Sequence, residues 1–332
     1  MSTPAIHEII AGRALSVEES KQLTYAIING AIAPAQIAAL LTTFAVRGID
    51  VDVLDGFSQA VLELARPLDL GGRECIDVCG TGGDGKGSFN ISTTVAFILA
   101  GAGYAVAKHG NVAVSSACGS SNVLQQLGIT LSEDASYLRR LLDLHNICFI
   151  HAPLFHPAFK QVASLRKELG FRTIFNALGP LINPARVAYQ YTGVYNLELQ
   201  RLYAYLLRRR GQKFAVVHSL DGYDEISLTA PTRVVAHCGT WELSPHQLQS
   251  PILVAEDLTA PVTPQESAQL IERILTGNAT ASQRKVVIAN AAVAIWCYEG
   301  ARNDLAHCKA IADESLISGS AYRVLQGCRG LL

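Results

Sequence analysis

Apolar residues recur about every three to four positions in the first part of the chain, as they do along one face of amphipathic helices. Ser16 and Glu19 form a capping-box pair, which predicts the start of a first helix. A second helix is expected from Pro34, and a third from about Asp52 to just before Pro67. The pattern therefore predicts a small all-helical domain over residues 1–67.

Beyond residue 67 the pattern changes to short apolar runs that alternate with helical segments. The runs "CIDVCG", "AVAKHG", "ICFIHA", "QYTGVY" and "KFAVVHS" predict strands. Helices are expected at about 91–102, 120–127, 135–144, 196–209, 264–276 and 281–297. This alternation predicts a large α/β domain over residues 68–332, with a central mixed sheet flanked by helices. The proline-bearing segment at about 158–182 is expected to leave the sheet and to pack back onto the helical domain.

Composition narrows the classes of function. The chain has 332 residues, 49% of them hydrophobic, and its 27 basic and 28 acidic residues give a net charge of −1. A chain without a basic excess has no overall field that draws it to nucleic acid or to an anionic membrane. No apolar run is long enough to span a bilayer, and the eight scattered cysteines fit reduced thiols. We therefore expect a cytoplasmic protein with small-molecule partners, neither nucleic acid nor membrane.

A glycine-rich loop follows the first predicted strand of the large domain. The stretch "GTGGDGKG" lies between that strand and a helix that begins near Asn90 or Ser92. Glycines allow successive backbone N–H groups to converge on an anion, and the helix N-terminus adds the positive end of its dipole. The spacing matches neither the nucleoside-triphosphate loop nor the dinucleotide fingerprint. The loop is either a phosphate cradle or an ordinary strand–helix turn.

Two further loops carry groups that suit a phosphorylated ligand. Lys108 to Asn111 follow the next predicted strand, and the hydroxyl-rich stretch from Ser115 to Ser121 leads into a helix. Asp221, Asp224 and Glu225 lie in a loop after a later strand. Adjacent loop carboxylates are commonly solvated, but beside phosphates they are also the ligands that Mg²⁺ takes. Both interpretations remain open from the residues alone.

Taken together, these stretches resemble the anthranilate phosphoribosyltransferase family. The resemblance is carried by "GTGGDGKGSFNIST", "AKHGN", "SSACGSSNVLQQLGI", "HPAFKQVASLRKELGFRTIFNALGPLINPA" and "VVHSLDGYDEIS". It implies transfer of phosphoribosyl from 5-phosphoribosyl 1-pyrophosphate to the amine of anthranilate, in tryptophan biosynthesis. It also implies two Mg²⁺ ions and a homodimer joined through the helical domain. The chain departs from the family's common pattern at Val112, where arginine is usual.

The resemblance also implies roles for individual residues. Those expected to bind 5-phosphoribosyl 1-pyrophosphate are Gly80, Gly82, Gly83, Asp84, Ser88, Asn90, Ser92, Thr93, Lys108 and Ser120. Those expected to line the anthranilate channel are Gly80, His109, Asn111, His156, Arg166, Gly179 and Pro180. Those expected to hold metal are Ser92, Asp224 and Glu225. No residue is assigned as a general acid or base, because an aryl amine is uncharged at neutral pH.

Two alternatives belong to the same fold. A nucleoside phosphorylase would use inorganic phosphate as the nucleophile, and the acidic pair Asp224 and Glu225 favours the metal-dependent transferase over it. A non-catalytic relative that binds nucleic acid would need a basic face, for which the balanced charge gives no excess.

Overall fold

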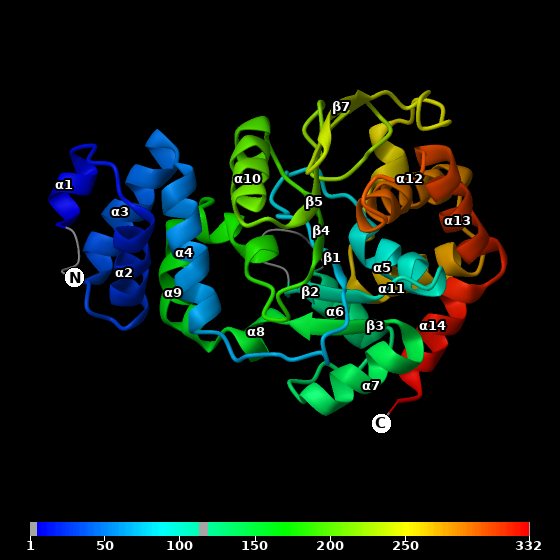
Figure 1. Ribbon diagram of the computed structural model, residues 1–332, viewed down its shortest axis with the longest axis horizontal. Helices are drawn as coiled ribbons and strands as arrows, with labels where there is room; N and C mark the ends of the chain where they lie inside the picture. The colour runs from blue at the N-terminus through cyan, green and yellow to red at the C-terminus, as the bar shows by residue number, and fades with distance from the viewer. Residues whose placement is uncertain (1–4, 113–118, 332) are drawn as a thin grey trace. The chain divides into compact units, whose positions relative to one another are not determined.

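The computed structural model describes residues 5–112 and 119–331 and divides the chain into two compact units. Unit 1 comprises Met1–Leu68 and Pro153–Arg186, and unit 2 comprises Asp69–Ala152 and Val187–Leu332. Figure 1 labels the elements of both. Each unit has its own apolar core.

Unit 1 is helical. Its first segment forms α1 (Ile6–Ile10), α2 (Val17–Ile28), α3 (Pro34–Arg47) and α4 (Val51–Glu63). The capping box of Ser16 and Glu19 is present at the start of α2, and Asp50 caps α4 through the backbone N–H of Val53. The second segment adds η1 (Pro157–Phe159), α9 (Lys160–Leu169), η2 (Ile174–Ala177) and η3 (Gly179–Leu181), while the short α8 (Ala152–Phe155) begins at its edge.

The second segment is packed into the helical core by aromatic side chains. Phe57 of α4 contacts Phe44 and Phe175 edge to face, with ring centroids 6.0 Å apart in each pair. Phe175 contacts Phe159 in the same manner at 5.8 Å. Edge-to-face pairs of this kind add stabilisation beyond the burial of apolar area. The ring cluster therefore ties η1 and η2 to α3 and α4.

Unit 2 is built on a seven-stranded mixed sheet in the part of the chain that the structure describes. The strands are β1 (Ile76–Val78), β2 (Val106–Gly110), β3 (Ile147–His151), β4 (Tyr189–Gly193), β5 (Lys213–Ser219), β6 (Thr232–Ala236) and β7 (Gly239–Leu243). Their order is β3-β2-β1-β4-β5-β6-β7. The first five strands are parallel, and the β5–β6 and β6–β7 pairings are antiparallel. The α/β class with a mixed sheet is confirmed, whereas β6 and β7 are strands that the apolar pattern did not predict.

Helices cover both faces of this sheet, and they lie on either side of β4 and β5 in Figure 1. α10 (Leu197–Arg209) lies on one side, and α5 (Ile91–Gly101) and α12 (Ala281–Tyr298) lie on the other. The remaining helices are α6 (Ser120–Gln126), α7 (Ala135–His145), η4 (Ala255–Leu258), α11 (Pro264–Leu275), α13 (Leu305–Ile317) and α14 (Ser320–Arg329). β1 is buried at every residue, as expected for a strand with helices on both faces.

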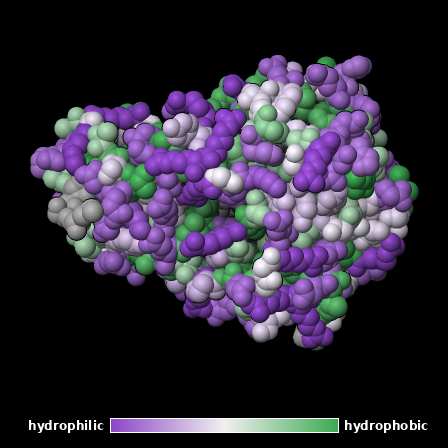
Figure 2. Space-filling model, in the orientation of Figure 1, coloured by the Kyte–Doolittle hydropathy of each residue, from purple (hydrophilic) through white to green (hydrophobic). Residues whose placement is uncertain are grey.

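Large apolar side chains are concentrated in the cores, and the visible surface mixes hydrophilic residues with scattered apolar ones (Figure 2). Val46, Ile252 and Val262 are exceptions that are more than 70% exposed. Among residues 5–112 and 119–331, no helix combines the length and the apolar character that crossing a membrane requires.

One buried side chain of α12 fixes the loop that follows β5. Asn290 is fully buried, and its amide oxygen accepts hydrogen bonds from Tyr191 Oη at 2.6 Å and from the backbone N–H of Ile226 at 3.0 Å. Its amide nitrogen donates to the carbonyls of Ile226 and Val286. This side chain thus pairs both backbone polar groups of Ile226, the residue after the acidic pair.

Replacing Asn290 with leucine should destabilise the protein strongly. An unpaired buried polar group costs about 1–3 kcal/mol, and Asn290→Leu leaves both backbone groups of Ile226 unpaired. We expect a loss of about 3 kcal/mol or more, measured by urea unfolding. Ser267→Ala is the matched control, because the Ser267 hydroxyl is buried without a hydrogen-bond partner among the described residues. Equal stability of the two variants would contradict this role of Asn290.

Candidate functional site

The glycine-rich loop of unit 2 runs from the end of β1 to the start of α5. Gly82, Gly83, Gly85 and Gly87 all have positive φ, between 63° and 78°, a conformation that residues with a Cβ rarely adopt. The backbone N–H of Gly82 donates to Asp224 Oδ2 at 2.7 Å. At Gly80, a Cβ atom would lie 3.2 Å from the same oxygen. The glycines therefore allow the loop to approach the acidic segment closely.

The acidic segment brings three carboxylates together. Asp224 and Glu225 are each only 7% exposed, and the backbone N–H of Asp224 donates to Asp84 Oδ2 at 3.3 Å. Burial raises the pKa of Asp224 well above its usual range, and repulsion from Asp84 and Glu225 adds to this. Burial also raises the pKa of Glu225 to about 7, although the attraction of Lys108 opposes the increase. Such a cluster is electrostatically unfavourable without a cation.

These residues fit a hard divalent cation. Glu225 Oε2 is buried and has no hydrogen-bond partner in the part of the chain that the structure describes. Ser92, in the first turn of α5, forms hydrogen bonds with Glu225 that lower the pKa of this carboxyl. Buried carboxylate and hydroxyl oxygens, with negative charge in excess, are the ligands that Mg²⁺ takes. The donor set of Asp84, Ser92, Asp224 and Glu225 is therefore compatible with magnesium.

Lys108 supplies a buried positive charge to this region. Its side chain is 3% exposed, and Nζ donates to the carbonyl of Val78 at 2.6 Å and to Ser92 Oγ at 3.2 Å. The ammonium group thus lies where β1 ends and α5 begins. Lys108, Ser92 and Glu225 form one connected set beside the glycine loop.

The other residues predicted for this unit lie in the glycine loop and near the starts of α5 and α6. Asn90 is the N-cap residue of α5, Thr93 is buried in its first turn, and Ser88 pairs with Thr259 in an isolated bridge. Ser120 Oγ donates to the carbonyl of Asn111 at 3.3 Å, which joins two further predicted residues. The predicted hydroxyl groups of Ser115 and Ser116 lie outside the described residues.

The remaining predicted residues belong to unit 1. Arg166 of α9 lies over the rings of Phe159 and Phe175, with its guanidinium carbon 6.0 and 5.6 Å from their centroids. Its Nε is buried without a hydrogen-bond partner among the described residues, and burial lowers its pKa. Aromatic faces hold a guanidinium by cation–π attraction and leave its hydrogen-bonding edge available for a planar anion. Gly179 and Pro180 form the short η3 turn.

His156 is buried in unit 1 and is only 2% exposed. Burial lowers its pKa to about 4, while hydrogen bonds with the backbone at Ile182 and Val61 oppose the decrease. The imidazole is therefore neutral at physiological pH and carries no charge that could attract a carboxylate. It contacts the Phe159 ring at 5.8 Å, so it packs beside the aromatic platform that holds Arg166.

Two residues that hold the acidic segment were missed by the sequence analysis. A Cβ on Gly193, the last residue of β4, would lie 1.4 Å from the carbonyl oxygen of Asp224. Only glycine fits there. The signal in the sequence was the position of this glycine within the predicted strand run "QYTGVY". The other is Asn290, whose role depends on a contact between distant segments.

Comparison with known proteins places both units in one family. The model of the glycosyl transferase family a/b domain matches residues 72–322, and that of the helical bundle domain of the same family matches residues 3–65. The anthranilate phosphoribosyltransferase of Flavobacterium johnsoniae is 45% identical over 321 residues, covering 97% of each chain.

Solved structures agree with this placement. The anthranilate phosphoribosyltransferase of Thermus thermophilus has a TM-score of 0.91 and 35% identity, and the match covers 98% of each chain. That of Saccharomyces cerevisiae, in complex with PRPP and Mg, has a TM-score of 0.86 and 27% identity, covering 94% of this chain and 92% of the other. A further structure of the yeast protein is in complex with 4-fluoroanthranilate, with a TM-score of 0.82, 25% identity and coverage of 94% and 92%.

The raised carboxyl pKa values predict how stability varies with pH. In the unfolded chain these carboxyl groups have pKa values of about 4, whereas in the folded chain the pKa of Glu225 is about 7. The folded state therefore binds more protons between these pH values. Without a divalent cation, stability should therefore fall as pH rises through this window. A bound Mg²⁺ offsets the repulsion between ionised carboxylates, so the gain in Tm on adding Mg²⁺ should be larger at about pH 8 than at about pH 5.5.

Thermal unfolding with Mg²⁺ or a chelator at both pH values measures this difference. Glu225→Gln should weaken the pH dependence of the gain, because the amide does not titrate. A gain in Tm that is the same at both pH values would show that these carboxylates do not bind the ion.

Proposed function

The chain belongs to the anthranilate phosphoribosyltransferase family, and we propose which of its residues carry out the transfer of the phosphoribosyl group. The enzyme transfers phosphoribosyl from 5-phosphoribosyl 1-pyrophosphate to the amine of anthranilate, releasing pyrophosphate, and so serves tryptophan biosynthesis. It is a magnesium-dependent pentosyltransferase. The observation that carries the assignment of residues is the buried carboxylate cluster beside the glycine loop.

We propose that unit 2 binds the phosphoribosyl donor. The backbone of Gly80 to Asp84 would hold the pyrophosphate, because positive-φ glycines let N–H groups approach an anion closely. Lys108 and Ser92 would add positive charge and a hydroxyl donor on the side of α5. The residues proposed to complete the donor site are Ser88, Asn90, Thr93 and Ser120.

Asp224, Glu225 and Ser92 would hold magnesium, as two ions. When bound, Mg²⁺ supplies positive charge that offsets the negative charge building on the leaving pyrophosphate. The protein itself would also contribute electrostatic stabilisation of the leaving group. Breaking the bond at the ribose C1 leaves an oxocarbenium-like ribose and an anionic leaving group, and backbone N–H donors aimed at that group stabilise it.

We propose that Arg166 binds the carboxylate of anthranilate. A guanidinium held flat on Phe159 and Phe175 is suited to a planar, bidentate partner. His109, Asn111, His156, Gly179, Pro180 and Gly80 are the other residues proposed for the acceptor. The aryl amine is neutral at physiological pH, so it can attack C1 without a general base, and none is assigned. Catalysis would then consist of positioning the two substrates and stabilising the charge that develops on the leaving pyrophosphate.

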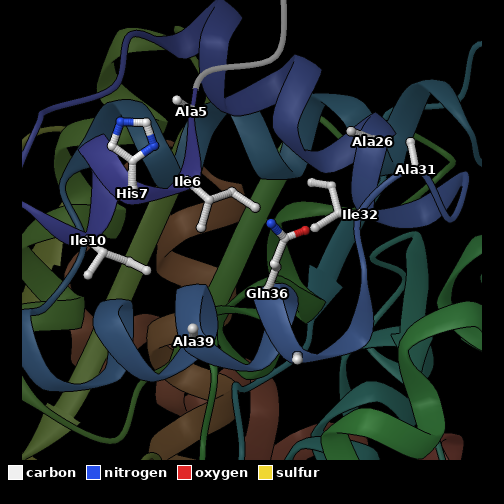
Figure 3. A pocket seen from close by; sticks show the side chains of 10 residues that line it. Ala5, Ile6, His7, Ile10, Ala26, Ala31, Ile32, Gln36 and Ala39 are labelled. Carbon is white, nitrogen blue, oxygen red and sulfur yellow. The ribbon is translucent and has the colours of Figure 1, made fainter.

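We also propose a homodimer formed through the helical unit. Residues of α1, α2 and α3 line a hollow of about 640 Å³, in which the side chains of Ile6, Ile32 and Gln36 lie close together (Figure 3). A largely apolar hollow on a small helical unit suits a contact with a second copy.

Ala39→Glu, within the lining, should shift the mass in sedimentation equilibrium from dimer to monomer, whereas Val46→Glu, which is outside the lining, should not. A monomeric wild type would refute the dimer.

A cytoplasmic location is proposed from the cysteines. All seven described cysteines are free thiols, which fits a reducing compartment.

The activity is tested by the loss of anthranilate fluorescence on mixing the purified protein with 5-phosphoribosyl 1-pyrophosphate and Mg²⁺. We expect loss that a chelator abolishes. The double variant Asp224→Asn, Glu225→Gln should lower kcat by at least about 100-fold, since removal of charge stabilisation costs this much, and should shift the Mg²⁺ titration. Asp221→Asn is the control, because Asp221 is an acidic residue of the same loop that is outside the proposed metal ligands and accepts a hydrogen bond from Thr229. An unchanged Mg²⁺ titration in the double variant would exclude this pair as the metal site.

Arg166→Ala should raise KM for anthranilate by about 10- to 100-fold, because a hydrogen bond to a charged group contributes about 1.5–3 kcal/mol. KM for 5-phosphoribosyl 1-pyrophosphate should change little. Lys167→Ala controls for the loss of a cation from the same helix, since Lys167 is exposed. Equal increases in both KM values for Arg166→Ala would rule out a specific role with the acceptor.

A further inference from the structure

Three potential metal ligands of different chemistry lie together where β1 and β2 end. Asp77 is in β1, Cys79 follows that strand, and His109 is in β2. Side chains two residues apart share one face of a strand, and the parallel pairing of Ile76 with Val106 brings Cys79 level with His109. The carboxylate oxygen, the thiol sulfur and the imidazole nitrogen all lie within 4.8 Å of one another.

This set differs from the proposed magnesium ligands in position and in chemistry. Lys108 precedes His109 in β2, so its side chain leaves the strand on the opposite face, where it contacts Ser92. Magnesium prefers oxygen ligands, whereas a thiolate, an imidazole and a carboxylate together are ligands that zinc accepts. Asp77 and His109 are 0% and 2% exposed, so two of the three groups are held in a buried frame.

We propose that Asp77, Cys79 and His109 bind one Zn²⁺ ion. Catalytic zinc sites have three protein ligands, and water or substrate takes the fourth position. Tetrahedral zinc–ligand bonds of about 2.0–2.3 Å place ligand atoms about 3.3–3.6 Å apart, so the side chains need to close by at most about 1.5 Å. The backbone N–H of His109 already donates to Asp77 Oδ1 at 3.1 Å, which holds two of the ligand residues together.

The site has a consequence for the acceptor, which rests on the proposed function. His109 is one of the residues proposed to line the acceptor channel, so an ion on its imidazole would withdraw it from that role. Zn²⁺ bound here would therefore compete with anthranilate, whereas the magnesium ligands would remain unaffected.

Binding is measured without substrates, so that it does not depend on the proposed function. Zn²⁺ is titrated in competition with a chromophoric chelator, and Co²⁺ is used as a second probe because a cobalt–thiolate bond gives a charge-transfer absorption. The wild type should bind one Zn²⁺ and show that absorption. Cys79→Val should weaken zinc binding at least about 100-fold and lose the cobalt band.

The matched control is Cys75→Val, because Cys75 is a buried thiol that precedes the same strand and is outside the cluster. It should bind Zn²⁺ and Co²⁺ like the wild type. Mg²⁺ in large excess should not displace the zinc. Loss of the cobalt band in both variants, zinc binding by Cys79→Val as tight as by the wild type, or displacement by Mg²⁺ would each overturn the proposal.

Discussion

Burying Asp224 and Glu225 beside Asp84 is the constraint on which the rest of unit 2 depends. Ionised carboxylates lose hydration when they are buried, and three of them in one place also repel one another. The surrounding structure holds them despite this cost. Gly82 donates its backbone N–H to Asp224, and Asn290 pairs both backbone groups of Ile226. The unfavourable cluster is thereby fixed in a position where a cation can relieve it.

The same constraint explains the composition of the neighbouring segments. Gly193 approaches the carbonyl of Asp224 too closely for any side chain, and Gly80 lies against the Asp224 carboxylate. The glycines near the acidic segment fall into two groups. Gly82, Gly83, Gly85 and Gly87 of the loop have positive φ, and Gly80 and Gly193 make room for the acidic segment. Lys108 supplies the opposite charge, and its attraction lowers the pKa of Glu225.

The apolar pattern predicted the parallel strands and most helices because each has a local signal. β5 coincides with the predicted run "KFAVVHS", and α2 begins at its predicted capping box. β6 was missed because its apolar run is only Val234 to Ala236, although four of its five residues are buried. β7 was missed because it is largely exposed and shows no buried apolar stretch. α13 was missed because apolar, small and charged residues are mixed along it.

The candidate site was predictable where its residues lie near or just after the ends of strands in recognisable stretches, as do the glycine loop, Lys108 of β2 and the acidic pair. The roles of Asn290 and Gly193 were not predictable, because they depend on contacts between segments far apart in the sequence. The Asp77, Cys79 and His109 cluster depends in the same way on the register between β1 and β2.

The most direct test of the account is a crystal structure of the protein with 5-phosphoribosyl 1-pyrophosphate and Mn²⁺, in which the ion is located by its anomalous scattering. We expect metal in contact with the carboxylates of Asp224 and Glu225, and the pyrophosphate against the backbone of Gly80 to Asp84. Metal bound away from both carboxylates, with the pyrophosphate clear of the glycine loop, would contradict it.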